Sequence, residues 1–239
     1  LSGSAHSGGI SNTATASRSP SITLGADGQP IVAWTEFTGS SSDVRVVRFD
    51  PTANAGAGGW VALGTSLGAG GISSTGGADH AVALNTAAGP VVVWLDSSSG
   101  KTQVYAKRFA AGAWTAFGVG GASGGGISTS ATSVSDLAAT TDGTKVAVAW
   151  SQLDPAAHQQ IYLREFSGTT WNELGGSASA GGVSGTNNAS RTPSLAYLGG
   201  SLFVAWQQEL PPNVVPVDIY VAAYTGGVWS AAGTGALSI

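Results

Sequence analysis

Val146-Ala147-Val148-Ala149-Trp150 is one of four short apolar runs that end in tryptophan, and these runs decide the fold. The other three runs end at Trp34, Trp94 and Trp206. Four further tryptophans follow Gly-rich turns at nearly the same spacing, so all eight fall into two columns; the second column is Trp60, Trp114, Trp171 and Trp229. The chain is therefore four copies of one unit, and such units bury their apolar faces only against one another.

Each copy contains four short strand-like runs joined by turns. In the third copy, Asp142-Gly143 suits a tight hairpin, because Asp-Gly supplies the positive φ that such a turn needs. The runs Val146–Trp150 and Ile161–Phe166 are apolar or β-branched, and Trp171 opens the fourth run. Apolar residues do not recur with the helical period. The sequence predicts an all-β chain, a β-propeller of four four-stranded blades, with part of a larger propeller as the alternative.

Short Gly-rich linkers separate the copies. They predict one propeller domain over residues 1–239, with repeats at about 10–71, 72–126, 127–182 and 183–239. We expect the tryptophan that opens each fourth strand to pack between blades.

Composition limits the classes of partner. Only 9% of residues are charged, the net charge is −4, and no basic cluster is present, which argues against nucleic-acid binding. Cysteine is absent, and no apolar run reaches the roughly 18 residues of a membrane span. The abundant Gly, Ser, Thr and Ala are typical of exported proteins, so we expect an extracellular, cell-surface or periplasmic location.

A ring of polar residues follows the repeat. Two positions after each second-strand tryptophan stands an oxygen-bearing side chain: Glu36, Asp96, Gln152 or Gln208. One hypothesis is that these side chains bind a sugar or a hard cation. The alternative is that they satisfy polar groups at the strand ends.

The loop between the second and third strands varies most between copies. It is longest and richest in proline in the fourth copy, where it carries Leu210, Pro211, Pro212, Val215 and Pro216. Because loops held by a rigid scaffold often carry recognition, these residues are predicted to contact a partner.

Signals for catalysis, metal binding or a cofactor are weak. His6, His80 and His158 occupy different repeat positions without metal-ligand spacing. The acidic residues are scattered over equivalent places, which suits a structural pattern. We therefore predict no catalytic residues, no metal and no cofactor.

The pattern SPSI, DGxPIVAW, VRVVRF and GGIS, over residues 19–73, resembles repeats of exported bacterial β-propeller proteins. The turn Phe166-Ser167-Gly168-Thr169-Thr170-Trp171 is similar to the tail of the Asp-box of sialidase-like propellers, without its Asp. Sialidases use an arginine triad and a Tyr nucleophile. Here Arg18 and Arg191 stand at equivalent places, and Ala78 and Ser133 are expected to replace them in the other copies. The resemblance implies a propeller and does not extend to sialidase activity.

The leading hypothesis is a non-catalytic, exported propeller that serves as a recognition or scaffold module for a protein partner or surface glycan. One alternative is a glycoside hydrolase or lyase of sialidase-like architecture, which needs two facing carboxylates or a Tyr/Glu pair. The other alternative is an accessory structural subunit of a larger surface or membrane complex.

Overall fold

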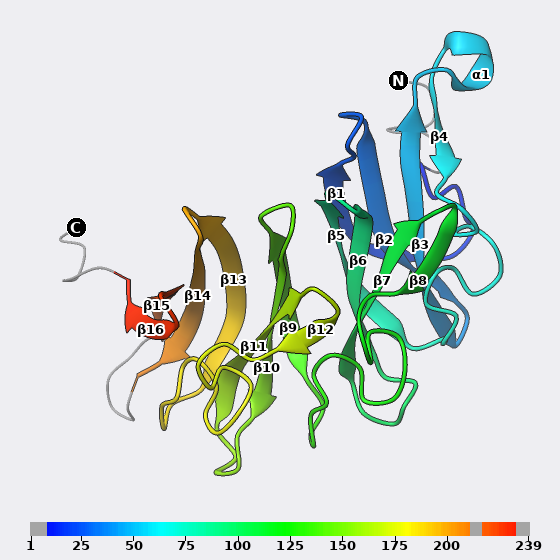
Figure 1. The fold of residues 1–239 in the computed structure, drawn as a ribbon. Helices are drawn as coiled ribbons and strands as arrows, with labels where there is room; N and C mark the ends of the chain where they lie inside the picture. The colour runs from blue at the N-terminus through cyan, green and yellow to red at the C-terminus, as the bar shows by residue number, and fades with distance from the viewer. Residues whose placement is uncertain (1–8, 211–216, 233–239) are drawn as a thin grey trace. The chain divides into compact units, whose positions relative to one another are not determined.

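The computed structural model describes residues 9–210 and 217–232, which form sixteen strands and one short helix (Figure 1). The strands make four antiparallel sheets of four, and each sheet uses consecutive strands in chain order. The sheets confirm the prediction of an all-β chain of four propeller blades. Within the described ranges, no helix has the length and apolar character needed to cross a membrane.

The chain divides into two compact units, Leu1–Gly126 and Ile127–Ile239, and each contains two sheets. This division falls at one of the expected repeat boundaries, and every sheet lies inside one expected repeat. The closure of all four repeats into one domain stays a prediction.

The first unit contains eight strands and the helix. Its first sheet is built from β1 (Ser17–Leu24), β2 (Pro30–Thr38), β3 (Ser41–Asp50) and β4 (Gly59–Ala62), with α1 (Ala53–Gly56) between the last two. Its second sheet is built from β5 (Ala78–Thr86), β6 (Gly89–Asp96), β7 (Gln103–Ala110) and β8 (Ala113–Ala116). Helix α1 is a single irregular turn, since Asn54 and Ala55 have left-handed backbone angles.

The second unit contains the other eight strands. One sheet is built from β9 (Ser135–Thr141), β10 (Val146–Leu153), β11 (Gln159–Ser167) and β12 (Thr170–Asn172). The other is built from β13 (Ser190–Leu198), β14 (Ser201–Glu209), β15 (Val217–Thr225) and β16 (Val228–Ala231).

The second strand of a blade is its most buried element. Residues Val146 to Ala149 of β10 have no exposed surface, and Trp150 is 1% exposed. A strand whose successive side chains point to opposite faces is buried throughout only when both faces of its sheet are covered. The continuous apolar runs of the sequence are therefore explained by packing on both sides.

The fourth-strand tryptophans connect neighbouring blades inside each unit. Trp114 Nε1 donates a hydrogen bond of 2.8 Å to the carbonyl oxygen of Leu63 in the preceding blade. Trp229 Nε1 makes the equivalent bond, 2.6 Å long, to Leu174. The expectation that these residues pack between blades is confirmed for both pairs.

Candidate functional site

The predicted polar ring is bonded to the tryptophans that precede it. In each blade the indole Nε1 of the second-strand tryptophan donates to the side chain two residues later, over 2.9 to 3.4 Å. The four acceptors are Glu36, Asp96, Gln152 and Gln208. Residues i and i+2 of a strand share a face, so the spacing places each oxygen beside its indole.

The ring residues have further partners inside the protein. Asp96 is 1% exposed and also accepts hydrogen bonds from Ser98 N and Thr75 Oγ1. Glu36 lies 3.7 Å from Arg45 Nη2. Their local role is thus to satisfy buried donors, and contact with a sugar or a cation stays a prediction.

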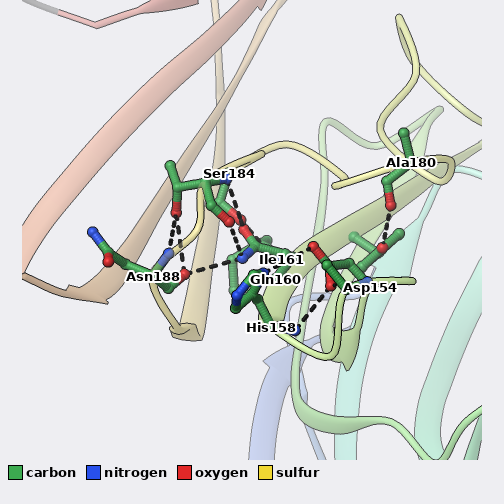
Figure 2. Close-up of polar contacts among 10 residues, drawn as sticks. Asp154, His158, Gln160, Ile161, Ala180, Ser184 and Asn188 are labelled. Carbon is green, nitrogen blue, oxygen red and sulfur yellow. Dashed lines mark hydrogen bonds and ion pairs between the residues drawn. The ribbon is translucent and has the colours of Figure 1, made fainter. Parts of the chain in front are cut away.

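A second polar position, which the sequence analysis did not identify, lies on the third strand of each blade, directly opposite the ring residue of the second strand. The residues paired with the ring are Asp43, Gln103, Gln160 and Asp218. Figure 2 shows Gln160 bound to the linker that follows its blade. Its amide donates to the carbonyls of Thr186 and Asn188 and accepts from Ser184 Oγ. The signal was a polar residue recurring at the start of each third strand.

The linker that Gln160 binds forms one wall of a cavity of about 410 Å³ in the second unit. The wall includes Asn187 and Asn188, next to the buried Gln160. The other sides come from the β10–β11 loop, the start of β13 and the end of β14, and supply His158, Gln159, Arg191, Glu209 and Leu210. This volume is within the range of about 300–1,000 Å³ that small-ligand pockets occupy.

Asp154 fixes the loop that carries His158. Asp154 Oδ1 accepts hydrogen bonds from the backbone N–H groups of Ala156 and His158, at 2.9 and 2.8 Å. Its Oδ2 lies 3.6 Å from His158 Nδ1, and Figure 2 marks this contact with a dashed line. Asp154 Oδ1 therefore fixes the backbone of the loop at His158, and Oδ2 lies beside the imidazole without a hydrogen bond to its buried Nδ1.

Glu209 brings an exposed carboxylate to the same cavity. Its backbone N–H is fixed by a 2.8 Å hydrogen bond to Ala189 O. Within residues 9–210 and 217–232, its side chain makes no hydrogen bond or ion pair. Glu209 is thus an exposed acidic group at the end of β14 that lines the cavity.

A β-bulge brings Arg191 to the cavity and corrects one expectation. Arg18 and Arg191 lie inside the first strands β1 and β13, opposite Thr35 and Gln207. The residues at the same register in the other two blades are Asp79 and Ser135, and not Ala78 and Ser133. The first strands extend beyond the apolar runs, and a bulge in each shifts the register, so counting from the sequence misplaced the equivalence.

Gln159 links Arg191 to the neighbouring blade. Arg191 Nη1 donates to Gln159 Oε1 over 3.3 Å, and Gln159 Nε2 donates to Ser135 Oγ over 3.1 Å. Ser135 Oγ in turn donates to Asp136 Oδ2 over 3.3 Å. The chain of bonds joins β13, β11 and β9 across two blades.

Of the predicted loop residues, Leu210 lines this cavity. Pro211, Pro212, Val215 and Pro216 lie outside the described residues. Their contact with a partner stays a prediction.

The first unit has a cavity of about 380 Å³ where its first strands end and its second strands begin. Its charged lining residues, Asp27 and Arg48, are paired with each other at 3.2 Å. The Asp27 carboxylate is therefore less available for acid–base catalysis than the carboxylate of Glu209, which has no ion-pair partner among the described residues.

A Tyr/Glu pair is also present in the second unit. Tyr197 Oη donates to Glu165 Oε2 over 2.7 Å, and Lys145 Nζ lies 3.3 Å from the other carboxylate oxygen. Burial, together with the hydrogen bond and charge of Glu165, raises the pKa of Tyr197 well above its usual range. Glu165 pairs with Ala147 near the start of β10, whereas Gln159 pairs with Leu153 at its end, so this pair lies far from the cavity.

Across the part of the chain that the structure describes, no group of three or more His, Asp or Glu side chains is arranged to hold a metal ion.

No protein-family model and no curated sequence matches the chain. Its fold does resemble solved structures. An α-L-arabinanase from Penicillium chrysogenum, complexed with arabinobiose, has a TM-score of 0.55 at 10% identity, over 87% of this chain and 62% of that one. A sialidase from Trypanosoma rangeli, complexed with the inhibitor DANA, has a TM-score of 0.54 at 13% identity, over 85% and 31%. A thermostable family-43 glycoside hydrolase gives 0.48 at 11% identity, over 90% and 74%.

The likeness to sialidase-like propellers is confirmed at the level of the fold. The comparison contradicts the expectation of a non-catalytic recognition or scaffold module, because the arabinanase and the sialidase that this fold resembles are glycoside hydrolases. The prediction that the chain is not an enzyme is wrong for the same reason. Most acidic residues follow the repeat, which is why the sequence analysis interpreted them as a structural pattern, and it did not predict Glu209 as a site residue.

Proposed function

We propose that the chain is a glycoside hydrolase, or the part of one that carries its saccharide site, and that the substrate binds in the cavity of the second unit. The observation that carries the proposal is that one cavity is lined by an exposed carboxylate, Glu209, and by the imidazole of His158, whose Nδ1 lies 3.6 Å from the carboxylate of Asp154. The likeness to an arabinanase and a sialidase supports it. The chain spans 62% of the first and 31% of the second, so the activity of a whole protein is part of the proposal.

Hydrolysis of a glycoside with inversion uses one group that protonates the leaving-group oxygen and one that accepts a proton from the attacking water. We assign Glu209 as the acid that protonates the leaving-group oxygen while the bond from the anomeric carbon to that oxygen breaks. His158 takes a proton from the attacking water, whose oxygen forms the new bond to the anomeric carbon. Asp154 stabilises the imidazolium that results. Solvent then returns the proton from His158 to Glu209, which restores both groups.

The remaining polar residues of the cavity suit the binding of sugar hydroxyls. The Asn187 and Asn188 side chains both donate and accept hydrogen bonds, and the Arg191 guanidinium donates. Leu210 supplies an apolar surface for the carbon face of a sugar ring. A propeller that hydrolyses polysaccharides outside the cytoplasm also fits the low charge of the chain.

Hydrolysis assays test the proposal. The chain is incubated with 4-nitrophenyl glycosides of arabinofuranose, xylose, galactose and mannose, with arabinan, and with a fluorogenic sialic acid glycoside. We expect hydrolysis of at least one, and a fall in kcat/KM of about 100- to 10,000-fold for Glu209→Gln and for His158→Ala.

Glu173→Gln is the matched control, because Glu173 is an exposed carboxylate of the same unit outside the cavity lining. It should leave both kcat and KM unchanged. Wild-type protein that cleaves none of these substrates, or Glu209→Gln with wild-type activity, would contradict the proposal.

A further inference from the structure

The first strand of every blade contains the same unusual backbone feature. Register shifts mark an irregularity near its start in all four blades. At that point stands a residue other than glycine with a left-handed backbone: Ser19 (φ 51°), His80 (φ 49°), Asp136 (φ 52°) and Thr192 (φ 50°).

Ser19 and Thr192 are costly choices for their positions, whereas His80 and Asp136 are residue types that tolerate a left-handed backbone better. A left-handed backbone brings the Cβ atom of an L-residue close to the following carbonyl, and a β-branched residue such as Thr192 tolerates it least. Thr192 and Ser19 are also followed by proline, which disfavours helical backbone angles in the preceding residue. Glycine would remove the strain, and the described chain uses glycine at most of its other left-handed positions. All four blades keep a side chain here, and the backbone cost of doing so is clearest for the β-branched Thr192.

In the second unit, one bulge residue, Arg191, lines the cavity, and the bulge of β9 is linked to it through Gln159. Asp136 follows Ser135 on β9, and Thr192 follows Arg191 on β13. Gln159 hydrogen-bonds to both Ser135 and Arg191, and it lines the cavity together with Arg191. Bulges are common next to active sites, because they turn a side chain out of the regular strand direction.

The chemistry of these residues fits a sugar with adjacent hydroxyl groups. A carboxylate accepts two O–H bonds and a guanidinium donates to two oxygens, while the Thr192 hydroxyl, which donates to Gln207 Oε1 over 3.4 Å, can still accept. Arg191 has no carboxylate partner among the described residues, since its one side-chain bond goes to the neutral amide of Gln159. Its charge is therefore available to a ligand.

We infer that Ser135–Asp136 and Arg191–Thr192, the bulge pairs of the second unit, form a saccharide-binding subsite next to the cavity, with Asp136 and Thr192 in contact with sugar hydroxyls. The inference rests on the proposed function for its ligand class and adds the residues that hold the sugar. It assigns the strained backbone the task of presenting these side chains.

Binding and melting measurements on matched glycine variants test this subsite. Asp136→Gly and Thr192→Gly each remove a side chain and relieve a left-handed residue. Ala111→Gly is the control, because Ala111 has a φ of 50° in the exposed β7–β8 turn of the other unit. The probes are a neutral disaccharide, arabinobiose, and an acidic one, digalacturonate, with Kd measured by ligand-observed NMR.

All three glycine variants are expected to keep or raise Tm, whereas only the two bulge variants raise Kd, by about tenfold or more for a lost charged or bidentate contact. Asp136→Asn tolerates the same backbone, so it should weaken binding without a change in Tm. Wild-type Kd values in Asp136→Asn and Thr192→Gly overturn the inference, and so does wild-type protein that binds neither probe.

Hydrolysis and binding separate the two proposals. Glu209→Gln is expected to bind the probes while losing hydrolysis. Wild-type protein that binds through Asp136 and Thr192 but hydrolyses no substrate contradicts the proposed function alone and supports the subsite.

Discussion

The indole Nε1 of Trp94 donates a 3.1 Å hydrogen bond to Asp96 Oδ2, inside a sheet where both residues are 1% exposed. A buried indole N–H needs an acceptor, and the side chain two residues along the same strand is the nearest on its face. The same pair recurs in all four blades, with Glu or Gln in place of Asp. This local requirement accounts for the spacing of tryptophan and oxygen-bearing residue in every repeat.

Asp96→Ala is expected to lower the free energy of unfolding by about 3 kcal/mol, because loss of a buried acceptor strands donors at about 1–3 kcal/mol each. The stranded donors are Trp94 Nε1, Thr75 Oγ1 and Ser98 N. Asp96→Asn keeps one acceptor oxygen and should cost less. Urea unfolding of both variants checks the order, and equal stability of Asp96→Ala and wild type would show that these bonds contribute nothing.

Trp150→Ala is expected to destabilise the protein by about 3–5 kcal/mol, the usual effect of truncating a large buried aromatic side chain. Trp150 is 1% exposed and hydrogen-bonded to Gln152. Trp150→Phe keeps much of the apolar volume and should cost less. Thermal unfolding measures both, and an unchanged Tm for Trp150→Ala would refute its place in the core.

Gln159 and Gln160 are neighbours with different expected effects. Gln160 has no exposed surface and binds the 184–188 linker through four hydrogen bonds, so Gln160→Ala should destabilise the protein by about 2–4 kcal/mol. Gln159 is half-buried at the cavity, so Gln159→Ala should leave stability within about 1 kcal/mol and weaken saccharide binding. Chemical unfolding and disaccharide titration measure the two effects, and the reverse pattern would contradict the assignment.

The repeat made the blades predictable. Trp34 and its equivalents mark second strands, and turn residues such as Asp142-Gly143 mark hairpins, because both signals are local. The bulges were not predictable in the same way. The main sequence signal for a left-handed backbone is glycine, and Ser19 and Thr192 give no such signal.

The candidate site was predicted only in part. Leu210 lies at the cavity, in the loop that the sequence singled out. Three other lining residues come from a loop, a bulge and a strand end of two blades: His158, Arg191 and Glu209. Their spacing along the chain does not predict that they line one cavity. Tertiary contacts of this kind depend on how adjacent blades pack, which a single repeat does not encode.

Tyr197→Phe tests the role of the Tyr/Glu pair through the pH dependence of stability. The folded state raises the pKa of Tyr197 above its usual value of 10.0, because burial and the nearby Glu165 carboxylate both disfavour the phenolate. The stabilisation from this group is therefore complete below about pH 10 and is lost as the pH rises toward the folded-state pKa, since the unfolded chain loses its proton first. Tyr197→Phe should lose about 1–2 kcal/mol of unfolding free energy near neutral pH from the missing hydrogen bond to Glu165, and this deficit should shrink above pH 10.

Tyr220→Phe, which removes a tyrosine without touching Glu165, is the control. Urea unfolding from pH 8 to 11 measures the difference, and hydrolysis at neutral pH should be unaffected by Tyr197→Phe. A deficit that stays constant above pH 10 would contradict the raised pKa, whereas lost hydrolysis with wild-type stability would move the catalytic assignment from the cavity to this pair.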